Sequence, residues 1–287
     1  LASLGVPLSI QQRILKYHDN RTVEILKSNP YALLGFGMSF PDIDAIGEQM
    51  GMEKSAPVRL AAALESAMRK EVEKGHTYAS HQALRPEVIR LLGDKALVAE
   101  AFASGYRNGQ FILRPETGTY HPTAQIMMES VVAKRLRALA AIKNEDESVF
   151  KALSEAVQEW PYDLTEQQLR AVESSLTNSV SCITGGAGTG KTTVLRTVLK
   201  AYAALGYKVH AVALSGRAAM RLHESIGFFT MTIARLLREE PISPSLDQAQ
   251  HLLVIDEASM IDLPTMYRIV THLDPSVRII LTGDPNQ

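Results

Sequence analysis

The sequence predicts an α/β domain with a parallel sheet, preceded by a mainly α-helical region. Two observations predict the α/β domain. A glycine-rich segment, 185–193, lies between an apolar run and an amphipathic stretch, and apolar strands alternate with helical patterns from residue 162 onward. A third observation predicts the helical region, because most apolar residues before 162 recur at helical spacing. We therefore expect two parts of different structural class.

The composition is that of a globular protein, with 46% hydrophobic and 21% charged residues among 287. The net charge of −1 gives no basic footprint for nucleic acid. We see no apolar run of membrane-spanning length and no secretory signal. The single cysteine, Cys182, is expected to be a buried small hydrophobe, which favours a reducing, cytoplasmic compartment. Because the sequence starts at Leu1 and stops at Gln287, just after an apolar strand, we expect a piece of a longer protein.

Residues 1–75 are expected to form short helices joined by tight turns. Two short helices around a glycine turn suggest a helix-hairpin-helix unit, whose backbone amides, near Gly37 and Ser39, would bind DNA phosphates without reading bases. The alternative is a helical packing module that binds no ligand. The expected elements are helices over 9–17, 21–29, 41–50 and 57–74, with the glycine turn at 35–40.

Residues 76–142 have the outline of a winged-helix module followed by a long helix. A wing can bind duplex DNA or only pack against neighbouring elements. The acidic bend after residue 142 and one further helix predict a linker over 143–161, with a boundary at Trp160-Pro161. The expected elements of the module are helices over 85–92, 94–104 and 122–142, and strands over 110–114 and 119–121.

Residues 162–287 are predicted to form a parallel sheet joined by right-handed crossovers. Ligands of such sheets bind beyond the carboxyl ends of the strands, where the polar segments of this region fall. The expected strands are 180–184, 207–213, 251–255 and 277–282, and the expected helices are 192–205, 216–226 and 263–273.

The glycine-rich segment fits the pattern G-x-x-x-x-G-K-[ST] of phosphate-binding loops. Its glycines let backbone N–H groups surround a phosphate, and the helix N-terminus adds a favourable dipole. Lys191 would reach the β- and γ-phosphates, and the Thr192 hydroxyl would hold Mg²⁺. The residues expected to bind the nucleotide here are Gly185, Gly186, Ala187, Gly188, Thr189, Gly190, Lys191, Thr192 and Thr193.

A second segment completes the expected site, since the apolar run 252–255 ends in Asp256 and Glu257. Asp256 would hold Mg²⁺ through its water shell. Glu257 would polarise the water that attacks the γ-phosphate, which favours hydrolysis over transfer to a small acceptor.

The second half of the chain resembles the RecD-like branch of superfamily 1 DNA helicases. The resemblance implies that Gln168 contacts the adenine edge and that Gln287 senses the γ-phosphate. It also implies that Ser215, Gly216 and Arg217 touch the backbone of single-stranded DNA. The matching segments are 164–172, 185–193, 213–222, 232–237, 254–262 and 281–287, with Ser215 in place of the usual threonine and Ala234 in place of a histidine.

The first half resembles the region that precedes the motor in stand-alone RecD-like helicases. The segments that carry this resemblance are 29–31, 37–40 and 75–78, with Ser39 replacing a glycine of the hairpin. The expected parts are a helix-hairpin-helix-like region (1–75), a winged-helix-like module with a long helix (76–142), a linker helix (143–161) and a first RecA-like ATPase domain ending after motif III (162–287).

By this resemblance, the parent protein would be an ATP-driven helicase moving 5′ to 3′, with ATP and Mg²⁺ as cofactors. Its partners would be single-stranded DNA and the duplex fork, with no membrane. A second motor domain, beyond Gln287, would supply the arginines that complete the ATP site. We therefore expect this chain alone to bind nucleotide and to hydrolyse it poorly.

Two alternatives remain open at this point. In the first, the ATP site is a switch in a DNA-binding or assembly subunit that unwinds little, a reading favoured by Ser39, Ala234 and the neutral charge. In the second, the chain is a P-loop kinase or small-molecule triphosphatase. The Gln168 segment and the segment 283–287 speak against the second alternative, because nucleotide kinases do not need them.

Overall fold

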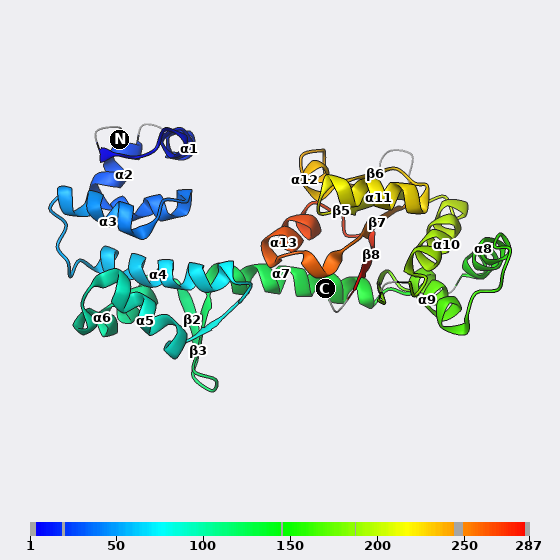
Figure 1. The fold of residues 1–287 in the computed structure, drawn as a ribbon, viewed down its shortest axis with the longest axis horizontal. Helices are drawn as coiled ribbons and strands as arrows, with labels where there is room; N and C mark the ends of the chain where they lie inside the picture. The colour runs from blue at the N-terminus through cyan, green and yellow to red at the C-terminus, as the bar shows by residue number, and fades with distance from the viewer. Residues whose placement is uncertain (1–3, 19–20, 145, 187, 244–248, 285–287) are drawn as a thin grey trace. The chain divides into compact units, whose positions relative to one another are not determined.

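The computed structural model describes residues 4–18, 21–144, 146–186, 188–243 and 249–284. Contacts divide the chain into two compact units, Leu1–Met127 and Met128–Gln287. The chain passes from one unit to the other within helix α7, Thr123–Ala140 (Figure 1). In the described part of the chain, each helix is too short or too polar to cross a membrane.

The first unit is mainly helical and carries a small antiparallel sheet. Its strands have the order β1-β3-β2, with Ala79 opposite Tyr120 and Phe111 opposite Pro122. This unit comprises α1 Leu8–His18, α2 Thr22–Ser28, the 3₁₀ helix η3 Pro30–Phe36, α3 Phe40–Gln49, α4 Pro57–Glu73, β1 Ala79–Ser80, α5 His81–Leu92, η4 Lys95–Leu97, α6 Val98–Arg107, β2 Phe111–Arg114 and β3 Thr119–Pro122.

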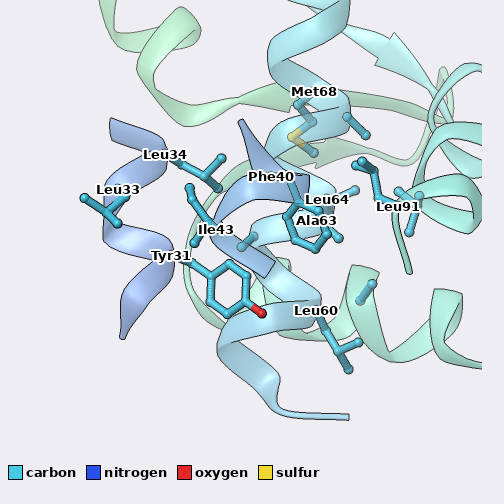
Figure 2. Close-up of a cluster of buried hydrophobic side chains, with 14 of the residues drawn as sticks. Tyr31, Leu33, Leu34, Phe40, Ile43, Leu60, Ala63, Leu64, Met68 and Leu91 are labelled. Atoms are coloured by element: carbon cyan, nitrogen blue, oxygen red, sulfur yellow. The ribbon is translucent and has the colours of Figure 1, made fainter. Parts of the chain in front are cut away.

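Helix α4 forms the centre of this unit. It packs against η3, α3, α5 and α6, and Figure 2 shows side chains from η3, α3, α4 and α5 gathered in one core. Gly105 permits a close approach of α6 to α4, because a Cβ at this position would lie 2.6 Å from Cδ2 of Leu64 on α4. The core takes Met68 from one side of residue 75 and Leu84 from the other. A division of the helical region into modules at residue 75 therefore stays a proposal.

The second unit contains a five-stranded, fully parallel sheet with the order β4-β8-β7-β5-β6. The predicted strands and helices of the α/β domain are all present. The unit comprises α8 Glu147–Gln158, α9 Glu166–Thr177, β4 Val180–Thr184, α10 Lys191–Ala204, β5 Lys208–Ala213, α11 Gly216–Ile226, β6 Thr230–Thr232, α12 Ile233–Leu236, β7 His251–Ile255, η5 Ala258–Met260, α13 Leu263–Thr271 and β8 Arg278–Gly283.

Helices cover both faces of this sheet (Figure 1). Successive residues of a strand point to opposite faces. On β7, Leu252 and Val254 therefore join the core formed with α8–α11, while Leu253 and Ile255 join the core formed with α7, α12 and α13. All five residues of β7 are buried, which fits a central strand of a parallel sheet covered on both sides.

Strand β6 and the exposure of Cys182 differ from the sequence-based expectation. Strand β6 was not predicted, because its three residues, Thr230–Thr232, are too few and too polar to give a strand pattern. The expectation that Cys182 is buried is wrong, since its side chain is exposed. The reason is that β4 lies at the edge of the sheet, where β8 is its one neighbour among the described strands.

Candidate functional site

The phosphate-binding loop joins the end of β4 to the start of α10, as predicted. Gly188 and Gly190 have φ values of +76° and +83°, a region that side chains with a Cβ rarely adopt. A Cβ on Gly190 would also lie 2.3 Å from Nε2 of Gln168. This loop conformation therefore requires glycine at position 190. Ala187, which we also expected to contact phosphate, lies outside the described residues.

Gln168 lies next to this loop at the start of α9. Its side chain accepts a hydrogen bond from the Thr165 amide at 3.0 Å, and Thr165 Oγ1 accepts one from the Gln168 amide at 3.3 Å. The two residues form a capping box at the helix N-terminus. Gln168 Nε2 also donates to the Thr189 carbonyl at 3.5 Å. The structure thus brings Gln168 to the loop, while its contact with adenine remains a proposal.

The Lys191 ammonium group turns toward the loop itself. It donates to the carbonyl oxygens of Gly185 and Gly186, the latter at 2.8 Å. Thr189 Oγ1 donates to the same Gly186 carbonyl at 2.9 Å. The lysine is therefore held within the loop, and binding of a phosphate would exchange these contacts with neutral carbonyl oxygens for contacts with negatively charged phosphate oxygens.

The two predicted carboxylates follow the buried strand β7. The Asp256 amide donates to the Val212 carbonyl at 2.9 Å, which extends the pairing of β7 with β5. Oδ1 of Asp256 accepts a hydrogen bond from the Thr282 hydroxyl of β8. Glu257 adopts φ 53° and ψ 37°, and it is the only non-glycine residue with positive φ in the described part of the chain. Such a conformation is rare for a side chain with a Cβ and often occurs at functional sites.

Residues of the loop and these two carboxylates line one cavity of about 210 Å³. Lys191 and Thr192 line it at the start of α10, and Asp256 and Glu257 line it at the end of β7. We did not predict Arg221, Thr282 and Asp284, which also line it. The helical spacing of Arg221 relative to Ala218 and Leu222 could have indicated its position. Gln287 lies outside the described residues.

The residues of this cavity fit Mg²⁺, which the loop pattern implies. Thr192 and Asp256 offer the oxygen ligands that this ion prefers, and they line the same cavity. Thr282 donates to Oδ1 of Asp256, and no residue in the described ranges donates a hydrogen bond to Oδ2. This oxygen therefore remains available to the ion or to its bound water. In the described ranges, no group of three or more His, Cys, Asp or Glu side chains is arranged to hold a metal ion.

The residues expected to contact single-stranded DNA lie at the exposed start of α11. Ser215 caps this helix, with Oγ accepting a hydrogen bond from the Ala218 amide at 3.1 Å. Gly216 and Arg217 in the first turn are exposed. These residues therefore lie exposed just after the carboxyl end of β5, and Asp256 follows the carboxyl end of the neighbouring strand β7.

The glycine turn of the first unit differs in detail from the expected phosphate site. The Gly37 amide donates to the Leu34 carbonyl at 3.1 Å, and the Met38 amide donates to the Leu33 carbonyl at 3.3 Å. Ser39 is the N-cap of α3, and its hydroxyl contacts Asp42. A phosphate contact from the Gly37 amide would therefore require an internal hydrogen bond to open.

Comparison with known proteins gives matches over both units. A family model described as an AAA domain matches residues 163–287, and one described as the ATP-dependent RecD2 DNA helicase HHH domain matches residues 1–78. The chain is 26% identical to the ATP-dependent RecD2 DNA helicase of Deinococcus radiodurans, over all of this chain and 42% of that protein. It is 36% identical to the RecBCD enzyme subunit RecD of Haemophilus influenzae, over 43% of this chain and 24% of that protein.

A third relative is named for conjugal transfer. The chain is 29% identical to the conjugal transfer protein TraA of Agrobacterium fabrum, over 71% of this chain and 18% of that protein. The chain thus spans less than half the length of each of these relatives. Together, the matches cover the phosphate-binding loop, the carboxylate pair and the helical N-terminal region.

Proposed function

Because this chain belongs to the RecD-like helicases, we propose that it forms the ATP-binding front half of a motor that moves 5′ to 3′ on single-stranded DNA. One observation carries the proposal. Lys191, Thr192, Asp256 and Glu257 come from two separate segments and line one cavity at the carboxyl ends of the strands. This is where a parallel α/β sheet binds its ligands.

Each residue then has a distinct role at the phosphate end of ATP. The loop amides and the Lys191 ammonium would hold the β- and γ-phosphates. Thr192 and Asp256 would hold Mg²⁺, which neutralises charge on those phosphates when bound. Glu257 would orient the attacking water and accept its proton. Gln168, beside the loop, would contact the adenine edge, and Gln287 would sense the γ-phosphate.

The DNA-binding side of the proposal rests on the exposed start of α11. Ser215, Gly216 and Arg217 would contact the strand backbone, because exposed N–H groups at a helix N-terminus bind phosphates. The helical first unit would lie near the duplex fork. Its match to a helicase helix-hairpin-helix model supports this placement.

A second motor domain would complete the ATP site with its arginines, as the resemblance implies. In the described part of the cavity, Lys191 and Arg221 are the only cationic side chains. An arginine supplied from elsewhere is typically worth about 10³–10⁵ in phosphoryl-transfer rate. The chain alone should therefore bind nucleotide and turn it over slowly. A cytoplasmic location is proposed on the same basis of family membership.

The decisive test is ATP turnover with and without single-stranded DNA. It would be measured for this chain and for a longer protein that joins it to a second motor domain, with Lys191→Ala as the blank. We expect strong DNA-stimulated turnover only in the longer protein. Turnover that DNA leaves unchanged in both would contradict the motor proposal and favour a nucleotide-switched DNA-binding subunit.

A further inference from the structure

Arg221 of α11 lines the candidate nucleotide cavity, although no phosphate-loop or acid-pair motif includes it. Its position follows from the helical repeat. Leu222 and Ile226 are buried in the core that α11 shares with α10, and Arg221 directly precedes Leu222. Ser225, one turn later, lines the cavity as well. The helix therefore presents the Arg221 side chain to the cavity while leaving it exposed to solvent.

The cavity belongs to the phosphate end of the site and not to the base end. Its lining includes the carboxylates Asp256 and Glu257 and the helix start at Lys191 and Thr192. Gln168, which lies beside Thr189 and Gly190, is not among the described residues that line the cavity. A side chain in this cavity would therefore meet the terminal phosphate sooner than the nucleobase.

The negative charges that line the cavity favour a second cation beside Lys191. Three carboxylates line it, from Asp256, Glu257 and Asp284, and ATP would add further negative charge. Lys191 is engaged by the carbonyl groups of Gly185 and Gly186. Within the described ranges, the Arg221 guanidinium forms no ion pair and no hydrogen bond, so its five N–H donors are free to bind an anion.

We propose that Arg221 binds the terminal phosphate of ATP and lets the site distinguish ATP from ADP. A guanidinium group matches the oxygens of a phosphate with two parallel hydrogen bonds, which an ammonium group cannot do. This inference rests on the proposed function, because it assumes that the cavity holds a nucleoside triphosphate. It adds a phosphate-sensing residue from within this chain to the arginines expected from a second motor domain.

The test compares binding of ADP with binding of a non-hydrolysable ATP analogue, both with Mg²⁺, by titration calorimetry. Arg221→Gln should weaken binding of the analogue by about ten-fold or more, the loss typical of a charge-assisted hydrogen bond, and should leave ADP binding unchanged. Arg221→Lys should restore part of the affinity, because it keeps the charge without the paired donors. Arg268→Gln is the matched control, since Arg268 is an exposed helical arginine of the same unit that does not line the cavity.

The outcomes separate this inference from the proposed function. An Arg221→Gln protein that keeps the wild-type preference between the two nucleotides would overturn the role of Arg221 while leaving the nucleotide site intact. Equal loss for both nucleotides would also overturn it, because a phosphate sensor affects only the triphosphate. A wild-type chain that binds neither nucleotide would overturn the proposed function itself. The melting temperature of each variant shows that the unit is folded, which is expected because Arg221 is exposed.

Discussion

Glu257 combines an expected catalytic role with an unfavourable backbone conformation. It follows the buried strand β7 and precedes the short 3₁₀ helix η5, so the chain must turn sharply at this residue. Its left-handed conformation is about 1–2 kcal/mol less favourable for a residue with a Cβ than the right-handed one. Glycine would adopt this conformation without that penalty. The sequence therefore keeps glutamate where the backbone alone would favour glycine, which points to a use for the carboxylate.

We predict that the backbone and the carboxylate of this residue can be tested separately. Glu257→Gly should be more stable to urea than Glu257→Ala by about 0.5–1 kcal/mol, because glycine relieves the strain but has more freedom in the unfolded chain. Glu257→Gln, in the longer protein with a second motor domain, should keep ATP binding and lose turnover by about 10²–10⁴.

The alanine variant is the matched control for the first part, since it removes the carboxylate and keeps the strain. Equal stability of the glycine and alanine variants would show that the left-handed conformation is not costly. Normal turnover by Glu257→Gln would show that another group activates the water.

The sequence predicts those site residues whose roles depend on short, contiguous patterns. Lys191 and Thr192 follow from the loop pattern, and Asp256 and Glu257 follow from an apolar strand that ends in acids. All four line the same cavity. Arg221 enters the site from a separate helix, and the family segment 213–222 that contains it predicts contacts with DNA but none with the nucleotide. Its approach depends on how α11 packs against α10, which local patterns do not specify.

The helices of the first unit are joined by polar contacts as well as by the apolar core. Arg59 of α4 is 4% exposed and donates to both carboxylate oxygens of Asp44 on α3, each at 2.8 Å. The Tyr31 hydroxyl of η3 donates to Oδ1 of Asp44 at 2.6 Å. Burial, and then this contact with Asp44, raise the pKa of Tyr31. Asp44 thus joins three successive elements, and its loss would leave a buried guanidinium group without an anionic partner.

A second link joins α4 to α5 and depends on pH. Glu87 of α5 accepts hydrogen bonds from Arg90 on its own helix and from Lys70 on α4. The bonds from Arg90, and then from Lys70, lower the pKa of Glu87 to about 2 although burial acts to raise it. A carboxylate with a lowered pKa stabilises the fold above its unfolded pKa of 4.5, and this contribution is lost as the pH falls toward 2.

We predict that the stability difference between wild type and Glu87→Gln shrinks as the pH falls from about 6 to about 3. The difference should stay below about 1 kcal/mol at pH 6, because the side chains of Lys70 and Arg90 are 52% and 60% exposed. Urea unfolding at a series of pH values measures it. Glu116→Gln is the control, since Glu116 lies exposed in the turn between β2 and β3. A difference that does not change with pH would show that the link contributes no net stabilisation.

At the level of elements, predictability follows the strength of the apolar pattern. The long helix α4 and the fully buried strand β7 were predicted almost to their ends, because their apolar residues keep a clear period. The two-residue strand β1 and the three-residue strand β6 were missed, because pairing with β3 and β5 defines them and such pairing leaves no local signal. The segment before α3 was predicted as a glycine turn, and the structure adds the 3₁₀ helix η3 there.

Helix α11 carries residues proposed to contact DNA and a residue proposed to contact the nucleotide. Its exposed first turn holds the residues expected on DNA, Ser215–Arg217, and Arg221 lines the nucleotide cavity. The rise of an α-helix separates Ser215 from Arg221 by roughly 9 Å along the axis. One helix therefore holds both groups of proposed contact residues.

The chain consists of two units, and among the residues that the structure describes, their cores have none in common. The apolar core of the first unit takes residues from 6 to 111, and the two cores of the second unit take residues from 139 to 280. The candidate nucleotide cavity is lined by the second unit alone. The Asp44–Arg59 pair lies in the first unit alone. Changes in these two places should therefore affect the unfolding of different parts of the chain.

We predict that calorimetry resolves two unfolding transitions. Substitution of Asp44 should shift the temperature of one transition, and ATP binding should shift that of the other. Asp44→Ala should lower one transition by about 10 °C or more, because an unpaired buried charge costs about 3–5 kcal/mol in a unit of this size. Mg²⁺ with ATP at 100 times its Kd should stabilise only the other unit, by about 2.7 kcal/mol. Lys191→Ala, the control, should abolish the shift caused by ATP and leave the transition lowered by Asp44→Ala unchanged. A single transition that both changes move would show that the units unfold together through α7, the helix in which one unit passes into the other.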